Sequence, residues 1–272
     1  MDKKISIITA SYNQGNFIED AILSVMNQEY SNYEHIIIDG ESNDKTISIL
    51  KKYKHLKWIS EKDSGQTDAL NKALKLAEGE IIGQLNADDY YYDNIFSEIN
   101  DKLSDQFVDG IYGNLHYVDK DKNIIDYRIA KSHYFISNKF VSKFICFIPS
   151  TTFFFKKSSL NNNISYDNDM NFGMDKDLYA NMYHNKFIIK KIEKNYAFMR
   201  LHENNKFEHK RGVGIFISDV KEGIKIYNKF SRIKLPINFI GLFIYTLIRF
   251  ILKCFGFIIF NFFNKKKLNK PE

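Results

Sequence analysis

The first 90 residues alternate between short apolar runs and segments with helical spacing. Four short runs rich in β-branched residues have the pattern of buried strands: residues 5–10 (ISIITA), 34–38, 56–59 and 80–85. Three segments between them place apolar side chains three and four positions apart, which predicts helices: residues 16–27, 46–53 and 67–77. Such regular alternation is typical of βαβ units, so we predict an α/β fold with a mostly parallel sheet flanked by helices.

The pattern becomes less regular after about residue 110. Residues 110–117, 124–128 and 187–192 predict further strands, and residues 175–183 predict a helix. We therefore expect one domain over residues 1–205, divided into halves at 1–115 and 116–205, followed by a helical basic and apolar tail at 206–272.

Polar segments follow each of the four predicted N-terminal strands, at residues 9–13, 39–44, 61–68 and 86–89. In open sheets of this kind, ligands bind beyond the carboxyl ends of the strands. The sequence therefore predicts that these four segments meet at one edge of the sheet and form a binding site there.

The last of these segments contains two adjacent carboxylates, Asp88 and Asp89. Two neighbouring carboxylates repel each other unless a cation offsets their charge. Mg²⁺ or Mn²⁺ typically takes oxygen ligands from one or two carboxylates and from substrate phosphates. A divalent metal site is the interpretation we favour, and an acidic turn that caps the next helix is the alternative.

Two long segments carry a specific resemblance: ISIITASYNQGNFIEDAILSVMNQEYSNYEHIIIDGESNDKT and EKDSGQTDALNKALKLAEGEIIGQLNADD. They resemble glycosyltransferase family 2, whose members have the GT-A fold, and in particular the branch that builds O-antigen, capsule and related polysaccharides. The resemblance is nearly continuous over residues 4–95 and weaker to about residue 205. It implies that residues 1–115 bind a nucleotide diphosphate sugar of the UDP or GDP type. It also implies that residues 116–205 bind a glycan or lipid-linked acceptor, and that transfer inverts the sugar with Mn²⁺ or Mg²⁺ as cofactor.

The resemblance assigns roles to particular residues. The substrate-binding residues it implies are Thr9, Ser11, Tyr12, Asn13, Asp39, Asp63, Asp68, Asn71, Lys72, Asn86 and Asp88. The metal ligands it implies are Asp88, Asp89 and His202, and the general base is Asp175, within FGMDKDLY. Asn86 stands where the family commonly has Asp, which keeps an oxygen ligand but removes a charge.

Simpler structural roles remain open for several of these side chains. Asn13 fits a helix cap as well as a nucleotide contact. Asp175 and Asp177 fit acidic residues that begin a helix, and we expect that role for Asp177. His202 fits an ordinary surface residue.

The C-terminal third has the opposite charge from the rest of the chain. Residues 1–189 hold 21 Lys and Arg against 27 Asp and Glu, whereas residues 190–272 hold 18 against 6. An apolar stretch at 237–263 contains Arg249 and Lys253 on one helical face and precedes a lysine cluster. Basic residues are costly at the centre of a bilayer. We therefore expect an interfacial or partly inserted helix pair, with a break near Gly256, on an anionic membrane surface. A dimerisation helix is the alternative.

Composition limits the remaining possibilities. Two cysteines and a short apolar N-terminal run predict a body in the cytosol. The tail would place that body at the cytoplasmic face of the plasma membrane, either peripherally or tail-anchored. The basic residues alternate with apolar ones and form no reading motif, so we expect no nucleic-acid partner. A sugar nucleotidyltransferase would need a basic glycine-rich loop after the first strand, and SYNQGN contains no Lys or Arg. A non-catalytic nucleotide-sugar-binding or scaffold protein remains the second alternative.

Overall fold

The structure is a computed structural model that describes residues 2–128, 148–160, 165–203, 213–238 and 240–251. In chain order the elements are β1 (Ile5–Ser11), α1 (Ile18–Met26), β2 (Tyr33–Asp39), α2 (Thr46–Leu50), β3 (Lys57–Ser60), α3 (Gln66–Leu76), β4 (Ile81–Gln84), β5 (Tyr90–Tyr91), α4 (Phe96–Ser104), β6 (Gly110–Val118), β7 (Ile124–Arg128), η2 (Ser150–Thr152), β8 (Phe153–Lys156), η3 (Lys157–Ser159), α6 (Met174–His184), β9 (Ile189–Arg200) and α8 (Val213–Phe230).

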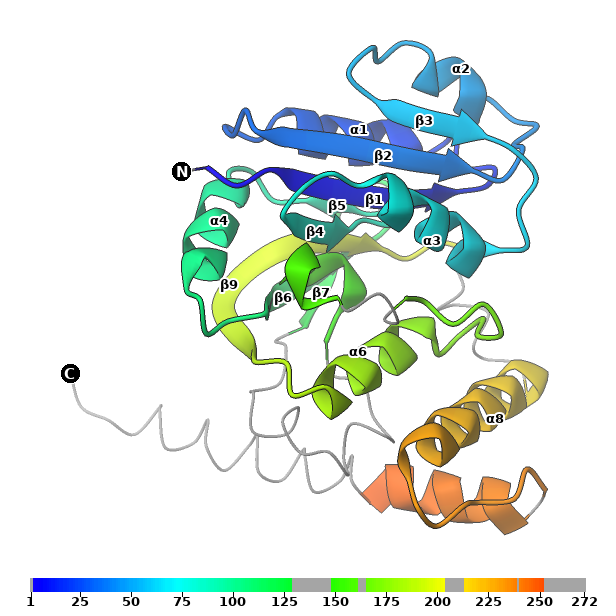
Figure 1. The fold of residues 1–272 in the computed structure, drawn as a ribbon. Coiled ribbons are helices and arrows are strands. Elements are labelled where there is room, and N and C mark those ends of the chain that lie inside the picture. The colour runs from blue at the N-terminus through cyan, green and yellow to red at the C-terminus, as the bar shows by residue number, and fades with distance from the viewer. Residues whose placement is uncertain (1, 129–147, 161–164, 204–212, 239, 252–272) are drawn as a thin grey trace, which may run out of the picture.

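One nine-stranded sheet runs through the domain in the order β3-β2-β1-β4-β8-β6-β9-β5, with β7 paired to β6 (Figure 1). The first four strands in that order are parallel to one another, as the alternating sequence pattern predicts. Beyond β4 the sheet is mixed: β8 is antiparallel to both β4 and β6, and β9 runs parallel to β6. The predicted α/β class is confirmed.

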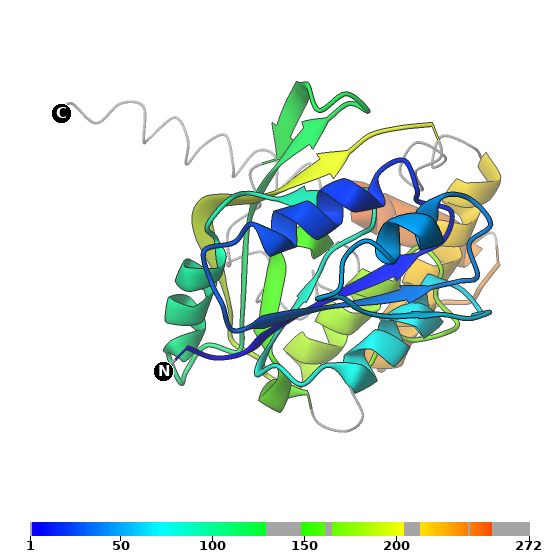
Figure 2. The same cartoon turned by 90° about the horizontal axis from the view of Figure 1, so that it is seen from above.

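Helices cover both faces of this sheet, which explains why isoleucines on both faces of β1 are buried. Ile5 and Ile7 of β1 point into the core formed with α1 and α4, whereas Ile8 points into the core formed with α3, α6 and α8. Figures 1 and 2 show α3 and α6 on one side of the sheet and α1 on the other. All three isoleucines are fully buried.

Several elements differ from the sequence-based prediction. The short strand β5 and the helix α4 follow the acidic segment and were not expected, and β9 extends eight residues beyond the predicted end at residue 192. That extension carries the chain to Arg200, which is 1% exposed and directs its guanidinium to Asp20 at 2.6 Å. A longer β9 therefore brings the residues after 200 back to the carboxyl edge of the sheet.

The C-terminal helices pack on the domain that precedes them. Helix α8 packs against α6, and a further helix at residues 240–251 contacts α8 through the buried Tyr245 and an Arg249–Asp219 ion pair of 2.6 Å. These contacts cross the expected boundary at residue 205. No helix within the described ranges is both long enough and apolar enough to span a bilayer. The expected break near Gly256 and the lysine cluster after it lie outside the described residues.

Candidate active site

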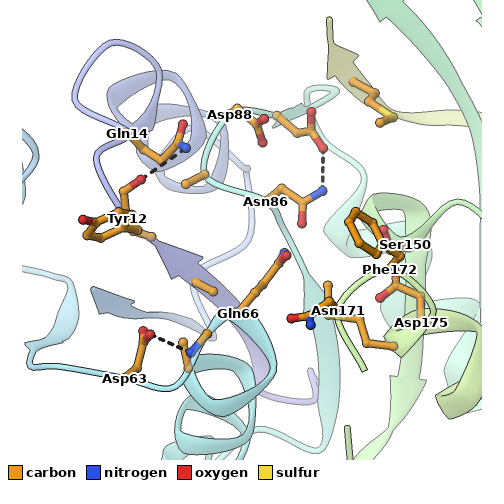
Figure 3. A pocket seen from close by; sticks show the side chains of 18 residues that line it. Tyr12, Gln14, Asp63, Gln66, Asn86, Asp88, Ser150, Asn171, Phe172 and Asp175 are labelled. Carbon is orange, nitrogen blue, oxygen red and sulfur yellow. Dashed lines mark hydrogen bonds between the residues drawn. The ribbon is translucent and has the colours of Figure 1, made fainter. Parts of the chain in front are cut away.

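A cavity of about 540 Å³ lies at the carboxyl ends of β1 and β4 and is bordered by the start of α6. Its lining residues are Ala10, Ser11, Tyr12, Gln14, Asp63, Gly65, Gln66, Ala69, Asn86, Ala87, Asp88, Asp89, Ser150, Asn171, Phe172, Met174, Asp175 and Met199. Figure 3 shows Tyr12 and Asp63 on one side, Asp175 and Ser150 on the other, and Asn86 and Asp88 between them. The cavity thus joins two walls that are far apart in sequence.

The end of β1 forms one wall. Ser11 is 4% exposed, and its hydroxyl has no hydrogen-bond partner among the described residues. Tyr12 is 59% exposed at the rim of the cavity. An unsatisfied buried hydroxyl costs free energy. The Ser11 side chain is therefore suited to a polar ligand group inside the cavity.

The turn before α3 lines the cavity on the same side as the end of β1. The Asp63 carboxylate accepts a hydrogen bond from the Gly65 N–H at 2.9 Å, which holds it at the edge of the cavity. Gly65 has φ +120° at the N-cap of α3, a conformation that strains other residues. The glycine is therefore required for the turn that presents Asp63 and Gln66.

The two adjacent carboxylates have different surroundings. Asp89 is 1% exposed and accepts hydrogen bonds from the Arg200 N–H and from the Asn86 amide, both at 2.9 Å. Burial, and then the neighbouring charge of Asp88, raise the pKa of the Asp89 carboxyl well above its usual value. Asp89 therefore fixes the turn to the end of β9, and Asp88 is the carboxylate that is more open to the cavity.

His202 lies beside Asp88, with 3.1 Å between its Nε2 and Asp88 Oδ2. The His202 side chain is 8% exposed and packs on the ring of Phe17, with centroids 4.4 Å apart. In the described part of the chain, no three His, Cys, Asp or Glu side chains converge into a complete metal cluster. The structure thus brings together two of the three predicted metal ligands, Asp88 and His202. The carboxylate of the third, Asp89, accepts hydrogen bonds from Arg200 and Asn86.

Asp175 forms the opposite wall, in the first turn of α6. Burial, and then the charge of Asp175, raise the pKa of the buried Tyr166 phenol well above its usual value. Tyr166 donates a hydrogen bond from its hydroxyl to Gln84 of β4 at 2.7 Å. Asp177 lies outside the cavity and pairs with Lys229 of α8 at 2.8 Å, in agreement with the structural role expected for it.

The cavity is strongly acidic. Four carboxylates line it, those of Asp63, Asp88, Asp89 and Asp175, and the described lining residues include no Lys or Arg. A diphosphate placed against such a surface would be repelled unless a cation offset the charge. The lining therefore favours a divalent cation together with any phosphate ligand.

Three predicted substrate-binding residues near the ends of β1 and β2 do not line the cavity. Thr9 is fully buried and bonds His35 at 3.0 Å. The Asn13 side chain accepts a hydrogen bond from the Asn43 N–H at 2.9 Å. Asp39 is fully buried and accepts hydrogen bonds from the Ser42 and Ser60 hydroxyls at 2.5 and 2.8 Å. These contacts hold the strand ends together, and the substrate contacts of these residues stay predictions.

Three predicted residues of α3 also have protein partners. Asp68 accepts hydrogen bonds from the Ser64 N–H and hydroxyl, both at 3.1 Å, and Lys72 pairs with Glu61 at 2.7 Å. The Asn71 side chain bonds both the N–H and the carbonyl of Tyr166, at 3.0 and 2.8 Å. In this structure Asn71 therefore holds the segment that leads to Asp175.

Several lining residues were absent from the sequence-based prediction: Gln14, Gln66, Ser150, Asn171 and Phe172. Gln14 and Gln66 lie within or beside predicted polar segments, so their position after strands was an available signal. Ser150, Asn171 and Phe172 come from irregular segments, whose course no periodic pattern predicts.

The sequence of the chain matches the family model "Glycosyl transferase family 2" over residues 6–183. The chain therefore belongs to glycosyl transferase family 2, and the family identified from the sequence is confirmed. This match covers β4 and nearly all of β1, at whose carboxyl ends the cavity lies, and nearly all of the helix that carries Asp175.

Curated relatives match parts of the chain. TuaG of Bacillus subtilis (strain 168), a glycosyltransferase whose name refers to teichuronic acid biosynthesis, is 40% identical over 91 residues, which are 31% of this chain and 36% of TuaG. WfaP of Escherichia coli, a UDP-Glc:α-D-GlcNAc-diphosphoundecaprenol β-1,3-glucosyltransferase, is 34% identical over 140 residues, which are 50% of this chain and 48% of WfaP. The matched region thus spans half of each relative or less.

Solved glycosyltransferase structures share the fold. S. aureus TarS 1–349 in complex with UDP-GlcNAc aligns with a TM-score of 0.64 at 18% identity, covering 85% of this chain and 68% of TarS 1–349. The mannosyltransferase PcManGT from Pyrobaculum calidifontis, in complex with GDP-Man and Mn²⁺, aligns with a TM-score of 0.62 at 16% identity. The alignment covers 84% of this chain and 64% of PcManGT. The predicted GT-A architecture is confirmed.

Proposed function

We propose that this chain transfers a sugar, with inversion, from a UDP- or GDP-type nucleotide sugar to a hydroxyl of a cell-surface glycan precursor. One observation carries the proposal: a single acidic cavity contains Ser11 from the end of β1, Asp88 from the turn after β4 and Asp175 from the start of α6. The first two residues suit a metal-bound diphosphate, and the third suits a general base on the opposite wall.

Asp88 and His202 would hold the divalent cation. Neighbouring ligands of an octahedral ion with bonds of about 2.1 Å lie about 3 Å apart, and Asp88 Oδ2 and His202 Nε2 are separated by 3.1 Å. Diphosphate oxygens would complete the ligand set, which agrees with the absence of a full protein cluster among the described residues. A bound Mn²⁺ or Mg²⁺ would offset the charge that develops on the departing diphosphate.

Asp175 would act on the acceptor. Its carboxylate takes the proton of the acceptor hydroxyl as that oxygen forms a bond to C1 of the donor sugar. The bond from C1 to the diphosphate oxygen breaks on the opposite face, and the nucleoside diphosphate leaves with the electron pair. Attack from the face opposite the leaving group inverts the configuration at C1, as expected for two separate walls.

The relatives support the substrate classes in this proposal. TarS and PcManGT bind UDP-GlcNAc and GDP-Man, and the WfaP acceptor is a lipid-linked diphosphate sugar. We extend the same classes to this chain, as a UDP- or GDP-sugar donor and a polyprenyl-diphosphate sugar acceptor.

A donor screen tests the proposal. The protein is incubated with UDP-Glc, UDP-GlcNAc or GDP-Man and a polyprenyl-diphosphate sugar, with Mn²⁺ or with EDTA, and the glycolipid product is measured by mass spectrometry. We expect product with one donor class in Mn²⁺ and none in EDTA. Equal turnover in EDTA would exclude the metal role, and nucleotide-sugar binding without transfer to any acceptor would favour the non-catalytic alternative.

We also propose that the C-terminal helix lies on the membrane. Five apolar side chains of residues 240–251 are 44–65% exposed: Ile240, Phe243, Leu247, Phe250 and Ile251. At 100° per residue they occupy an arc of about 100°, while Tyr245 on the opposite side is buried against α8. Exposed basic residues, Arg232 and Lys234, lie in the segment that precedes this helix. An apolar stripe with basic neighbours suits an anionic lipid surface at the cytoplasmic face, where a lipid-linked acceptor would lie.

Vesicle sedimentation tests this placement. We expect the full chain to pellet with vesicles containing phosphatidylglycerol and much less with phosphatidylcholine alone. The double variant Phe243→Ser/Phe250→Ser should lose most of this binding. A matched double variant on β7, Ile124→Ser/Ile125→Ser, removes side chains of similar exposure and should keep it. If the first pair kept normal vesicle binding but changed the molecular mass in solution, the helix would be a dimer interface instead.

A further inference from the structure

A buried carboxylate on α8 holds the turn that precedes the Asp175 helix. Glu222 is 7% exposed, and its Oε1 accepts a hydrogen bond from the Asn171 N–H at 3.0 Å. Its Oε2 accepts from the N–H groups of Phe172 and Gly173 at 2.9 and 2.7 Å. One side chain thus satisfies three successive backbone donors at the beginning of α6.

These three backbone N–H groups lie at the beginning of the cavity wall that carries Asp175, here called the acceptor wall. Gly173 is the N-cap of α6, and Asp175 is two residues further along. Asn171 and Phe172 line the cavity themselves, whereas Glu222 is not among the lining residues. A carboxylate at a helix N-terminus is favoured by the helix dipole, and its charge strengthens each hydrogen bond. Glu222 therefore anchors the turn from which α6 begins, two residues before Asp175.

The other end of the same segment is held from a different helix. Asn71 of α3 bonds the backbone of Tyr166 in both directions. Residues 166–173 thus have one end fixed by α3 and the other by α8, with little regular structure between them. Glu222 is the contact that comes from beyond the region matched by the family model, which ends at residue 183.

We propose that Glu222 is a positioning residue, which holds the 171–173 turn so that Asp175 faces the acceptor hydroxyl. The inference rests on the proposed function, because it takes Asp175 as the base. A misplacement of about 1 Å at a reacting group can lower a rate by about 100-fold. The acceptor wall of this protein therefore depends on a helix that the sequence suggests is only a basic tail.

Steady-state kinetics of three variants test the proposal. Glu222→Ala removes all three hydrogen bonds to the backbone N–H groups of residues 171–173 and should lower kcat roughly 10–100-fold. The Mn²⁺-dependent affinity for nucleoside diphosphate should change less than about twofold. Glu222→Gln keeps one oxygen and should fall between Ala and the parent. Glu222→Asp should recover part of the loss, because it restores the carboxylate on a shorter side chain.

Lys229→Met provides the matched control, since Lys229 also extends from α8, to Asp177 of α6 at 2.8 Å and to Asp167 at 3.6 Å, but does not contact the 171–173 turn. This control should lower the melting temperature at least as much as Glu222→Gln while kcat, measured well below both melting temperatures, stays within about threefold. Equal losses of kcat in the two variants would show that Glu222 only docks the helices and would overturn the proposal.

Hydrogen–deuterium exchange supplies a readout that does not depend on activity. In Glu222→Gln we expect faster exchange at the Phe172 and Gly173 amides and unchanged exchange in the middle of α6. Faster exchange with an unchanged kcat would also overturn the positioning role. Full activity of Asp175→Asn would instead refute the base assignment in the proposed function, so the two failures are distinguishable.

Discussion

The two walls of the cavity are built in different ways. On the wall proposed to bind the sugar donor, Ser11 and Asp88 lie at or directly after strands of a parallel sheet, so their positions follow from strand register. On the acceptor wall, Asp175 follows an irregular segment that is held by side chains 95 and 51 residues away in sequence, Asn71 at Tyr166 and Glu222 at Asn171. The comparison teaches that one wall is specified locally and the other by tertiary contacts.

The sharpest test of this division is the removal of the charge on Asp175. Asp175→Asn should lower kcat by roughly 10²–10⁴-fold, which is the contribution of a general base. The affinity for nucleoside diphosphate and Mn²⁺, measured by calorimetry, should stay within twofold, because the donor wall is untouched. Asp177→Asn is the matched control, since Asp177 lies in the same helical turn, pairs with Lys229 and faces away from the cavity.

If Asp175→Asn retained near-normal turnover, the acceptor wall would contain a different base. If it retained turnover and lost nucleotide affinity instead, the two walls would not divide the reaction as proposed.

The converse change on the donor wall is Asp88→Ala. It should weaken Mn²⁺-dependent binding of UDP or GDP at least tenfold, toward the value measured in EDTA, because it removes a carboxylate ligand from the predicted cation site. Asp93→Ala is the control, since Asp93 is an exposed carboxylate outside the cavity. Binding by Asp88→Ala that still responded normally to Mn²⁺ would contradict the assignment of the metal to this wall.

The sequence predicted the donor wall more completely than the acceptor wall, because strand register fixes the first and tertiary contacts fix the second. Strand periodicity located β1 and β4, and the polar segments after them supplied Ser11 and Asp88. The family resemblance, rather than any periodic pattern, supplied Asp175. Neither signal could supply Glu222, because its role appears only when α8 packs on α6. The orientation of the Thr9 and Asp39 side chains could not be predicted from the sequence either, because both bond residues of neighbouring strands instead of lining the cavity.

The buried polar core beneath the donor wall predicts how that half responds to acid. Burial lowers the pKa of His35 to about 3 from the usual 6.5, so the folded protein keeps this imidazole neutral. The unfolded chain gains a proton as the pH falls through 6.5, so stability is fully present above pH 6.5 and is lost progressively toward pH 3. The contribution of His35 to the free energy of unfolding should fall by about 2 kcal/mol between pH 7 and pH 5.

Urea titrations at pH 7 and pH 5 measure this effect, and His35→Gln should lose much less stability over the same interval. Glu34 does not contribute in that window: burial raises its pKa, but hydrogen bonds and ion pairs outweigh burial and lower it to about 2, so its contribution is lost only below about pH 4.5. The buried Asp89 carboxyl acts in the opposite direction, because its raised pKa favours the folded state as the pH falls, and the comparison with His35→Gln isolates the imidazole. Trp58, the single tryptophan, lies in β3 and reports on the donor half, whereas far-UV circular dichroism also reports on α6 and α8. If the urea transitions seen by Trp58 fluorescence and by circular dichroism coincide, the donor half and the half that contains α6 and α8 unfold together. If the two transitions are separate, only the donor half responds to acid.

The smallest expected effect distinguishes a binding hydroxyl from a structural one. Ser11→Ala removes a buried hydroxyl that has no partner among the described residues, so the melting temperature should stay the same or rise slightly. If that hydroxyl bonds the nucleotide sugar, the affinity for nucleoside diphosphate should fall by about three- to tenfold, the value of one hydrogen bond. Ser150→Ala, on the acceptor wall of the same cavity, should leave this affinity unchanged. A loss of nucleotide affinity in Ser150→Ala but not in Ser11→Ala would reverse the assignment of the two walls, because the diphosphate would then lie against η2 and α6 instead of β1 and β4.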